Sequence, residues 1–471
     1  MSISRTPSSR TLVAFGALLI ILAFGTTLRY QAFAHSIVPD YPHGDSAKYF
    51  LYAYNLKNFG IYTYGEMAVL PHDTDKSVAR EKIKPDAIIT PGYPHYLSLF
   101  LGGKYEKSQS DRARFGQVVL SSLTILLAYA AFAPLGRLYG LGLALLTAAS
   151  PHLINMNLFL LTETLFCFFV MALVWTISRI NTKSRLPWFL LMGILLAVAT
   201  MTRPWIQAYL FVLMGYLFLS KLRFSGGQVF LVFVGAAIVA TPWLVRNTAV
   251  LGSASDSSQL NASIHHGMYP SMMYEEQSES LGYAYRADPK SPELGQSLGT
   301  TLSEIGRRAK AEPYKYAKWY LVGKIQTVLS WKIIAGADAI FVYHVDGSPY
   351  FYVPKFYLSA YYMEKAHGVL MVLALIGTLV VWLPRRLQRQ SAEQIFFLRT
   401  VSLLIIYFLA LHMVVAPYPR YSIPMRPVLY AMALYPLVFV VRTGWIERKL
   451  SKLLHRRENQ ILITRDDRHG E

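Results

Sequence analysis

The sequence predicts an all-α polytopic membrane protein with about ten transmembrane helices. Of its 471 residues, 54% are apolar and only 15% are charged, which excludes a disordered chain and an ordinary soluble enzyme. A helix needs about 20 apolar residues to cross roughly 30 Å of hydrocarbon, and ten stretches approach that length. They lie near residues 11–33, 118–135, 139–154, 157–177, 187–201, 205–219, 228–245, 367–383, 395–416 and 423–441.

The first stretch and two divisions between stretches need separate arguments. Residues 11–33 are longer than the apolar region of a normal signal peptide and lack a clear cleavage site, so we expect a retained membrane anchor. Residues 186–220 would be about 52 Å long as one helix, so Thr202-Arg203-Pro204 is predicted to form a tight hairpin. By the same reasoning, Pro151-His152 divides residues 138–178.

Basic residues predict the orientation. The 46 Lys and Arg residues exceed the 27 Asp and Glu residues, giving a net charge of +19, which would suggest nucleic acid binding if it lay on a soluble domain. Here the basic residues lie mostly between apolar stretches, so we expect no nucleic acid partner and infer that they mark the cytoplasmic side. With ten spans, both termini and four basic loops fall on that side. The loops contain Arg137; Arg179, Lys183 and Arg185; Lys221 and Arg223; and Arg385, Arg386 and Arg389.

This topology, in the inner (plasma) membrane, predicts four regions. They are an N-terminal transmembrane module (1–246) with a first external loop (35–115), an external segment (247–365), C-terminal transmembrane helices (366–445) and a basic cytoplasmic tail (446–471). The tail is expected to adhere to anionic membrane lipids. Residues 314–334 are amphipathic, and with Trp319 and Trp331 they are expected to lie along the lipid headgroups.

Asp45 opens the most informative motif, Tyr41-Pro-His-Gly-Asp-Ser-Ala-Lys-Tyr-Phe, in the first external loop. Gly44-Asp45-Ser46 is typical of a helix start and Asn58-Phe59-Gly60 of a helix end. On this helix Asp45, Lys48, Tyr49 and Tyr52 share one face. Asp45 is then either an N-cap of its own helix or a general base, with Lys48 and His43 near a phosphate. The two roles are compatible.

Glu163 is the second carboxylate of interest. It lies in Leu160-Leu-Thr-Glu-Thr-Leu, near the outer end of an otherwise apolar helix. An ionisable group there costs several kcal/mol unless it is paired or faces a water-filled cavity, so it marks a functional site by default. An interhelical hydrogen bond is the simpler alternative.

Three arginines stand at outer ends of predicted spans, namely Arg203, Arg246 and Arg420. For each one alone, extension of the side chain to the membrane surface is a sufficient explanation. Three together, on the side normally poor in basic residues, indicate an anionic ligand, and phosphate suits the planar donors of arginine. A second motif of the first external loop, Thr90-Pro91-Gly-Tyr93-Pro, predicts a turn.

In chain order these pieces resemble the GT-C membrane glycosyltransferases, which include protein O-mannosyltransferases and bacterial aminoarabinose transferases. The resemblance covers most of the chain. It rests on the order of short motifs: Asp45 opening a helix, Pro91-Gly-Tyr-Pro, Glu163 in Thr-Glu-Thr-Leu, Pro242-Trp-Leu-Val-Arg-Asn, and Arg420-Tyr-Ser-Ile-Pro. The first loop departs from the paired acidic residues of eukaryotic mannosyltransferases, and no soluble carboxy-terminal domain is expected. Both departures favour a bacterial lipid or glycan transferase.

The resemblance implies an inverting transfer from a polyprenyl-phosphate sugar donor to a lipid or glycan acceptor on the periplasmic, external side. It implies Asp45 as the catalytic base and Glu163 as a second catalytic carboxylate. Preorganised cations would stabilise the leaving phosphate: Lys48, His43, Arg203, Arg246 and Arg420. We expect contacts to the sugar or lipid from Tyr49, Tyr52, Tyr93 and Tyr421, and also from Tyr269, although packing is the simpler role for any single tyrosine.

The sequence identifies no certain cofactor. No spacing of metal ligands is recognisable, and the adjacent side chains of His265 and His266 point in different directions on regular secondary structure. A divalent cation is compatible with the chemistry. The alternative function is a transporter or flippase that handles a lipid-linked sugar without transfer, which predicts ionisable residues near the midplane of several helices. If the transferase reading is right, Asp45, Glu163 and at least one of the three arginines should line one external cavity.

Overall fold

The computed structural model describes residues 9–39, 44–65, 84–102 and 106–444. Within these residues the fold is helical, and pairing of extended backbone is limited to one isolated antiparallel bridge between Ile37 and Gly347. The predicted basic tail and His43 lie outside the described residues. The all-α prediction is therefore confirmed.

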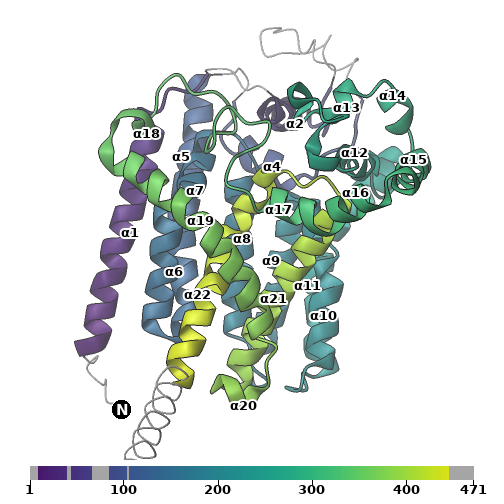
Figure 1. Ribbon diagram of the computed structural model, residues 1–471. Coiled ribbons are helices and arrows are strands. Elements are labelled where there is room, and N and C mark those ends of the chain that lie inside the picture. Colours follow the sequence, from purple (N-terminus) through teal and green to yellow (C-terminus); the bar gives the residue numbers. More distant parts are fainter. Residues whose placement is uncertain (1–8, 40–43, 66–83, 103–105, 445–471) are drawn as a thin grey trace, which may run out of the picture.

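Ten apolar helices form the bundle in Figure 1. Six are long and apolar enough to cross a membrane: α1 (Ser9–His35), α5 (Lys107–Phe132), α11 (Gly226–Leu251), α19 (Pro354–Val380), α21 (Ala392–Val414) and α22 (Arg426–Thr443). Four are shorter: α6 (Arg137–Ala149), α8 (Glu163–Ser178), α9 (Leu186–Thr202) and α10 (Tyr209–Leu219). This arrangement supports a multi-pass membrane protein, while the count of ten spans stays a prediction.

The helices outside the bundle gather mainly at one end of it, here called the loop end (Figure 1). The first loop contributes α2 (Asp45–Phe59) and α4 (Gly92–Ser98), and the turn before α8 contains α7 (Pro151–Asn155). The second segment contributes α12 (Ser258–Gly267), α13 (Ala284–Ala287), α14 (Ser291–Leu294), α15 (Leu298–Ala311), α16 (Pro313–Lys318), α17 (Lys324–Val328) and α18 (Pro349–Tyr352). Helix α20 (Arg385–Gln388) lies at the opposite end.

Short one-turn helices connect these elements. They are η1 (Ala133–Leu135), η2 (Met156–Leu158), η3 (Pro204–Ile206), η4 (Pro270–Met272), η5 (Ser278–Ser280), the π-helical η6 (Trp319–Gly323) and η7 (Pro419–Met425). Arg203 stands in an extended conformation between α9 and η3. The predicted hairpin at Thr202-Arg203-Pro204 is therefore present.

Three boundaries differ from the sequence prediction. The helix expected from residue 157 begins at Glu163, because the Gln117 side chain binds the carbonyl oxygens of Asn157 (3.2 Å) and Phe159 (2.9 Å) and holds them outside the helix. Helix α11 continues to Leu251 and α19 begins at Pro354, so both helices extend into the residues predicted as the second external segment.

The predicted headgroup helix at residues 314–334 is the third difference. It consists of α16, η6 and α17 and ends at Val328. Trp319 is buried and donates to the carbonyl oxygen of Gly267 at 3.0 Å, while Trp331 is buried edge-on against His152. The prediction that these tryptophans face the headgroups was wrong, because the second segment packs them into the protein.

Candidate functional site

Asp45 is the first residue of α2, and Gly44 occupies the N-cap position. The N-cap residue is therefore Gly44, which has no side chain to cap the helix, and the N-cap alternative for Asp45 was wrong. The Asp45 carboxylate instead accepts a hydrogen bond from Arg420 Nη2 at 2.6 Å. Since Arg420 lies on η7, this ion pair joins the first loop to the segment before α22.

Glu163 lies beneath that pair. It is the first residue of α8, where the helix dipole favours a negative charge. Its Oε1 is 3.2 Å from Arg420 Nε and 3.5 Å from Arg203 Nη1, and its side chain is 2% exposed. The four side chains form one cluster of two carboxylates and two arginines. Asp45, at 40% exposure, is its open edge.

The arginines hold the carboxylates differently. Arg420 contacts both of them, whereas Arg203 makes only the longer ion pair, and its Nη1 has no hydrogen-bond partner among the described residues. The Arg203 guanidinium lies over the Tyr421 ring, 5.1 Å from the ring centre. Arg203 therefore keeps donor capacity within a buried site.

Charge contacts control the ionisation of Asp45. Burial by itself would raise the pKa of its carboxyl, but the contacts with Arg420, Lys48 and Arg203 together outweigh burial. The pKa therefore lies below its usual value of 3.8. Asp45 is an anion at neutral pH.

The predicted aromatic residues lie at different depths. Tyr49 is half-buried and packs edge-on against Tyr93, with ring centres 5.2 Å apart. Tyr93 is fully buried, and its hydroxyl donates to Gln117. Lys48 is exposed one turn from Asp45. Of this group, Lys48, Tyr49 and Tyr421 have accessible surface for a ligand.

Arg246 and Tyr52 lie in a separate group around Asp86. Arg246 donates to the backbone carbonyls of Asp86 (2.7 Å) and Tyr62 (2.9 Å), and the Tyr52 hydroxyl donates to the Asp86 carboxylate. Tyr52 is 1% exposed. Arg246 thus fixes the first loop to the end of α11, and Tyr52 makes its contact within that loop. The structure does not bring either residue into the cluster.

Gly92 explains how the first loop reaches Arg203. The predicted turn at Pro91-Gly-Tyr-Pro is a short helix, α4, whose first residue is Gly92. A Cβ atom at Gly92 would lie 2.7 Å from the backbone of Met201 and 2.8 Å from the nitrogen of Thr202. Only glycine allows α4 this close to the residues before Arg203.

A cavity lies behind Glu163, within the bundle. Its polar lining includes Arg29, Ser121, Thr147, Glu163 and Thr164. Arg29 is fully buried, and its guanidinium binds Ser121 and three backbone carbonyls. Asp45 and the site arginines do not line this cavity. Asp45, Glu163 and two of the three arginines therefore lie together as predicted. Of these residues, Glu163 lines the cavity.

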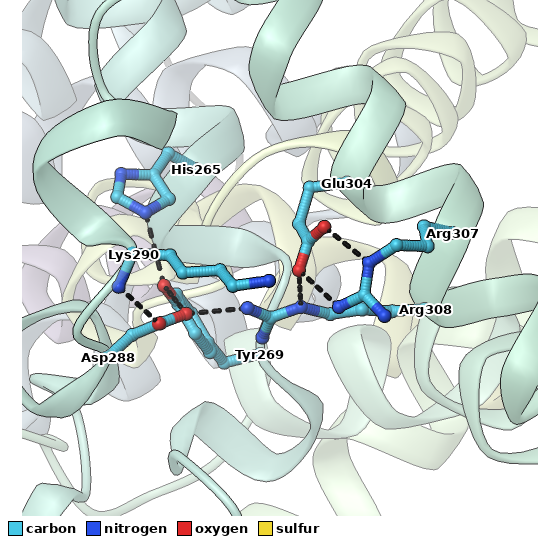
Figure 2. Close-up of polar contacts among 7 residues, drawn as sticks. All are labelled: His265, Tyr269, Asp288, Lys290, Glu304, Arg307 and Arg308. Atoms are coloured by element: carbon cyan, nitrogen blue, oxygen red, sulfur yellow. Dashed lines mark hydrogen bonds and ion pairs between the residues drawn. The ribbon is translucent and has the colours of Figure 1, made fainter.

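A second polar network lies in the second segment (Figure 2). Arg308 binds Asp288 (2.6 Å) and Glu304 (2.8 Å), and the Tyr269 hydroxyl donates to Asp288 and lies 3.1 Å from His265 Nε2. The network links α12, α14 and α15 and leaves its carboxylates paired. Tyr269, a predicted sugar or lipid contact, is buried within it. Its contacts are structural.

In the part of the chain that the structure describes, no group of three or more His, Cys, Asp or Glu side chains is arranged to hold a metal ion.

Residues 96–245 match the family of dolichyl-phosphate-mannose-protein mannosyltransferases. This stretch contains Glu163 and Arg203 of the cluster. No curated protein matches the chain.

Two solved structures are similar at low identity. One is ArnT from Cupriavidus metallidurans bound to undecaprenyl phosphate, with 11% identity, a TM-score of 0.38, and coverage of 91% of this chain and 60% of that chain. The other is the Archaeoglobus fulgidus oligosaccharyltransferase in the apo form, with 16% identity, a TM-score of 0.47, and coverage of 94% of this chain and 52% of that chain. The chain spans less than two thirds of either. The family match over residues 96–245 agrees with the resemblance to the GT-C membrane glycosyltransferases that the sequence predicted.

Proposed function

We propose that the chain is an inverting glycosyltransferase that moves a sugar from a polyprenyl-phosphate donor to a hydroxyl of a lipid or glycan acceptor. The observation that carries the proposal is the cluster of Asp45, Glu163, Arg203 and Arg420 at the loop end of an apolar bundle. The family match supports the donor class, since its description names a dolichyl-phosphate-linked mannose. In this proposal the loop end faces the periplasm from the inner membrane.

Asp45 is the proposed base because it is the ionised and accessible carboxylate of the cluster. It accepts the proton of the acceptor hydroxyl while the hydroxyl oxygen forms a bond to the anomeric carbon. The bond from that carbon to the phosphate oxygen breaks, and its electron pair leaves with the lipid phosphate. Attack opposite the leaving group inverts the configuration.

The proposed phosphate site follows from a charge count. By formal charge, Arg203, Arg420 and Lys48 contribute three positive charges and Asp45 and Glu163 contribute two negative ones, which gives the site a net formal charge of +1. That charge suits the single negative charge of a phosphodiester. Glu163 holds the two arginines in place, and such preorganised donors stabilise charge that develops on a leaving group.

The location of the charges favours transfer over transport. The charged side chains of the cluster belong to α2, the start of α8, the end of α9 and η7, all at the loop end. A transporter would place its substrate site near the bilayer midplane. The competing function is movement of the lipid-linked donor across the membrane without sugar transfer, and the experiment must distinguish the two.

The test uses the full chain in proteoliposomes with a panel of undecaprenyl-phosphate sugars and extracted envelope lipids as acceptors, with and without EDTA. Asp45→Asn should lower transfer about 10²–10⁴-fold, the usual contribution of a general base, while Asp111→Asn on α5 should not. Product NMR reports the anomeric configuration. Full transfer by Asp45→Asn excludes the base assignment, and donor translocation with no glycosylated product excludes the transferase.

A further inference from the structure

The backbone of Asp45 makes a contact that the proposed chemistry does not use. The Asp45 N–H donates to the hydroxyl of Tyr343 at 3.0 Å, across 298 residues of sequence. The first N–H groups of a helix have no partner within it, and the N-cap residue Gly44 has no side chain to supply one. A tyrosine of the second segment therefore takes the place of the missing cap.

Gly44 is fitted to this contact. Its φ of 58° lies in the left-handed region, which favours glycine. A Cβ atom at Gly44 would lie 3.1 Å from the Tyr343 hydroxyl oxygen, so a larger residue would press on the same hydroxyl. The backbone before Asp45 thus accommodates Tyr343 in both conformation and space.

Tyr343 is itself held firmly. Its ring packs edge-on against Phe159, four residues before Glu163, with ring centres 5.4 Å apart. The loop that follows is tied to the chain leaving α1, because Ile37 and Gly347 form an antiparallel bridge and Asp346 donates to the Ile37 carbonyl at 2.9 Å. Tyr343 therefore links α1, α2 and the segment that leads to Glu163.

The tyrosine adds no charge to the site. Burial, together with the nearby Asp45 carboxylate, raises the pKa of the Tyr343 hydroxyl. It stays protonated, so its effect on Asp45 is one of position.

We propose that Tyr343 is a positioning residue that fixes the first turn of α2 and so aims the Asp45 carboxylate. This inference rests on the proposed function. A misplacement of about 1 Å in a reacting group can reduce rate about 10²-fold, so loss of the contact acts on kcat. Arg203 and Arg420 of the proposed phosphate site lie outside α2, and only Lys48 lies on it, so the donor KM should change less than kcat.

The test compares Tyr343→Phe with Tyr320→Phe, using the full chain in nanodiscs and the donor panel above. The Tyr320 hydroxyl is buried without a hydrogen-bond partner in the described structure, which makes it a matched control. Tyr343→Phe should lower kcat at least tenfold, and Gly44→Ala should act in the same direction. Unchanged kcat, an equal loss in Tyr320→Phe, or a rise in donor KM alone would overturn the proposal.

Hydrogen exchange of residues 44–50 separates this inference from the proposed function. Tyr343→Phe should speed amide exchange at the start of α2 at least tenfold, and Tyr320→Phe should leave it unchanged, whether or not transfer is observed. If the wild-type chain transfers no sugar, the proposed function fails while the exchange result still decides the positioning role. Unchanged exchange in Tyr343→Phe overturns it.

Discussion

Replacing Arg420 with alanine tests the geometry of the cluster directly. The guanidinium binds Asp45 at 2.6 Å and Glu163 at 3.2 Å, so the substitution removes a partner from both carboxylates. The two losses differ in size because the Asp45 side chain is 40% exposed and the Glu163 side chain is 2% exposed. Water can replace the partner of Asp45, but it has little access to Glu163.

The expected destabilisation follows from these exposures. An exposed pair such as that of Asp45 contributes about 0–1 kcal/mol. Removing one partner of a buried pair costs about 3–5 kcal/mol. Arg203 remains 3.5 Å from Glu163, so Glu163 is not left without a counter-charge. We therefore expect a loss of about 3 kcal/mol, at the lower end of the buried range.

The measurement is the free energy of unfolding in mixed micelles, together with sugar transfer. Arg420→Ala should lose both stability and transfer. The double variant Arg420→Ala with Glu163→Gln removes the excess buried charge, so it should recover to within about 1 kcal/mol of wild type while transfer stays absent. Wild-type stability in Arg420→Ala, or transfer by the double variant, would refute the ion-pair argument.

Two further predictions concern packing and pH. Gly92→Ala should destabilise the chain by about 1–3 kcal/mol, the usual cost of overpacking, and should raise the donor KM because it displaces Arg203. Thermal unfolding measures the loss of stability. The control is Gly215→Ala, where the added carbon atom meets nothing within 4 Å. In the network of Figure 2, the pKa of Glu304 is lowered from 4.5 to about 2. Hydrogen bonding by Arg307 is the largest cause, and the hydrogen bond from Arg308 lowers the pKa further. A carboxyl with a lowered pKa stabilises the fold above its unfolded pKa, so this contribution should be lost as pH falls from about 4.5 toward 2, as followed by hydrogen exchange of α12–α15. An Arg308→Ala variant with an unchanged acid transition would contradict that assignment.

The sequence predicted what depends on local pattern. Apolar stretches and their Pro and Gly breaks located the bundle helices, although α5 and α19 begin well before the predicted stretches, at Lys107 and Pro354. Helix α2 runs from Asp45 to Phe59 as its start and stop residues indicated. The carboxylates Asp45 and Glu163 were identifiable because each stands out against its surroundings. We also expected both to lie near at least one of the three arginines, and the structure brings Arg203 and Arg420 to them.

The failures involve contacts between distant parts of the chain. Arg246 has the same local setting as the other two arginines, and only the fold of the first loop shows that backbone carbonyls occupy its donors. Trp319 and Trp331 looked interfacial because amphipathicity cannot distinguish lipid from a protein partner. Tyr343 gave no signal, since one tyrosine among 32 is distinguished only by the backbone N–H that it meets.

The pairing of Asp45 with Arg420 has a consequence for how the protein is made. The two residues are separated by 375 positions, so when the ribosome has inserted the first membrane helix and released α2, almost the whole chain is still to be synthesised. The carboxylate meets its arginine only after the segment before the last helix has been inserted. A chain interrupted at any earlier point contains Asp45 without Arg420, so the cluster of two carboxylates and two arginines is complete only when synthesis is nearly finished.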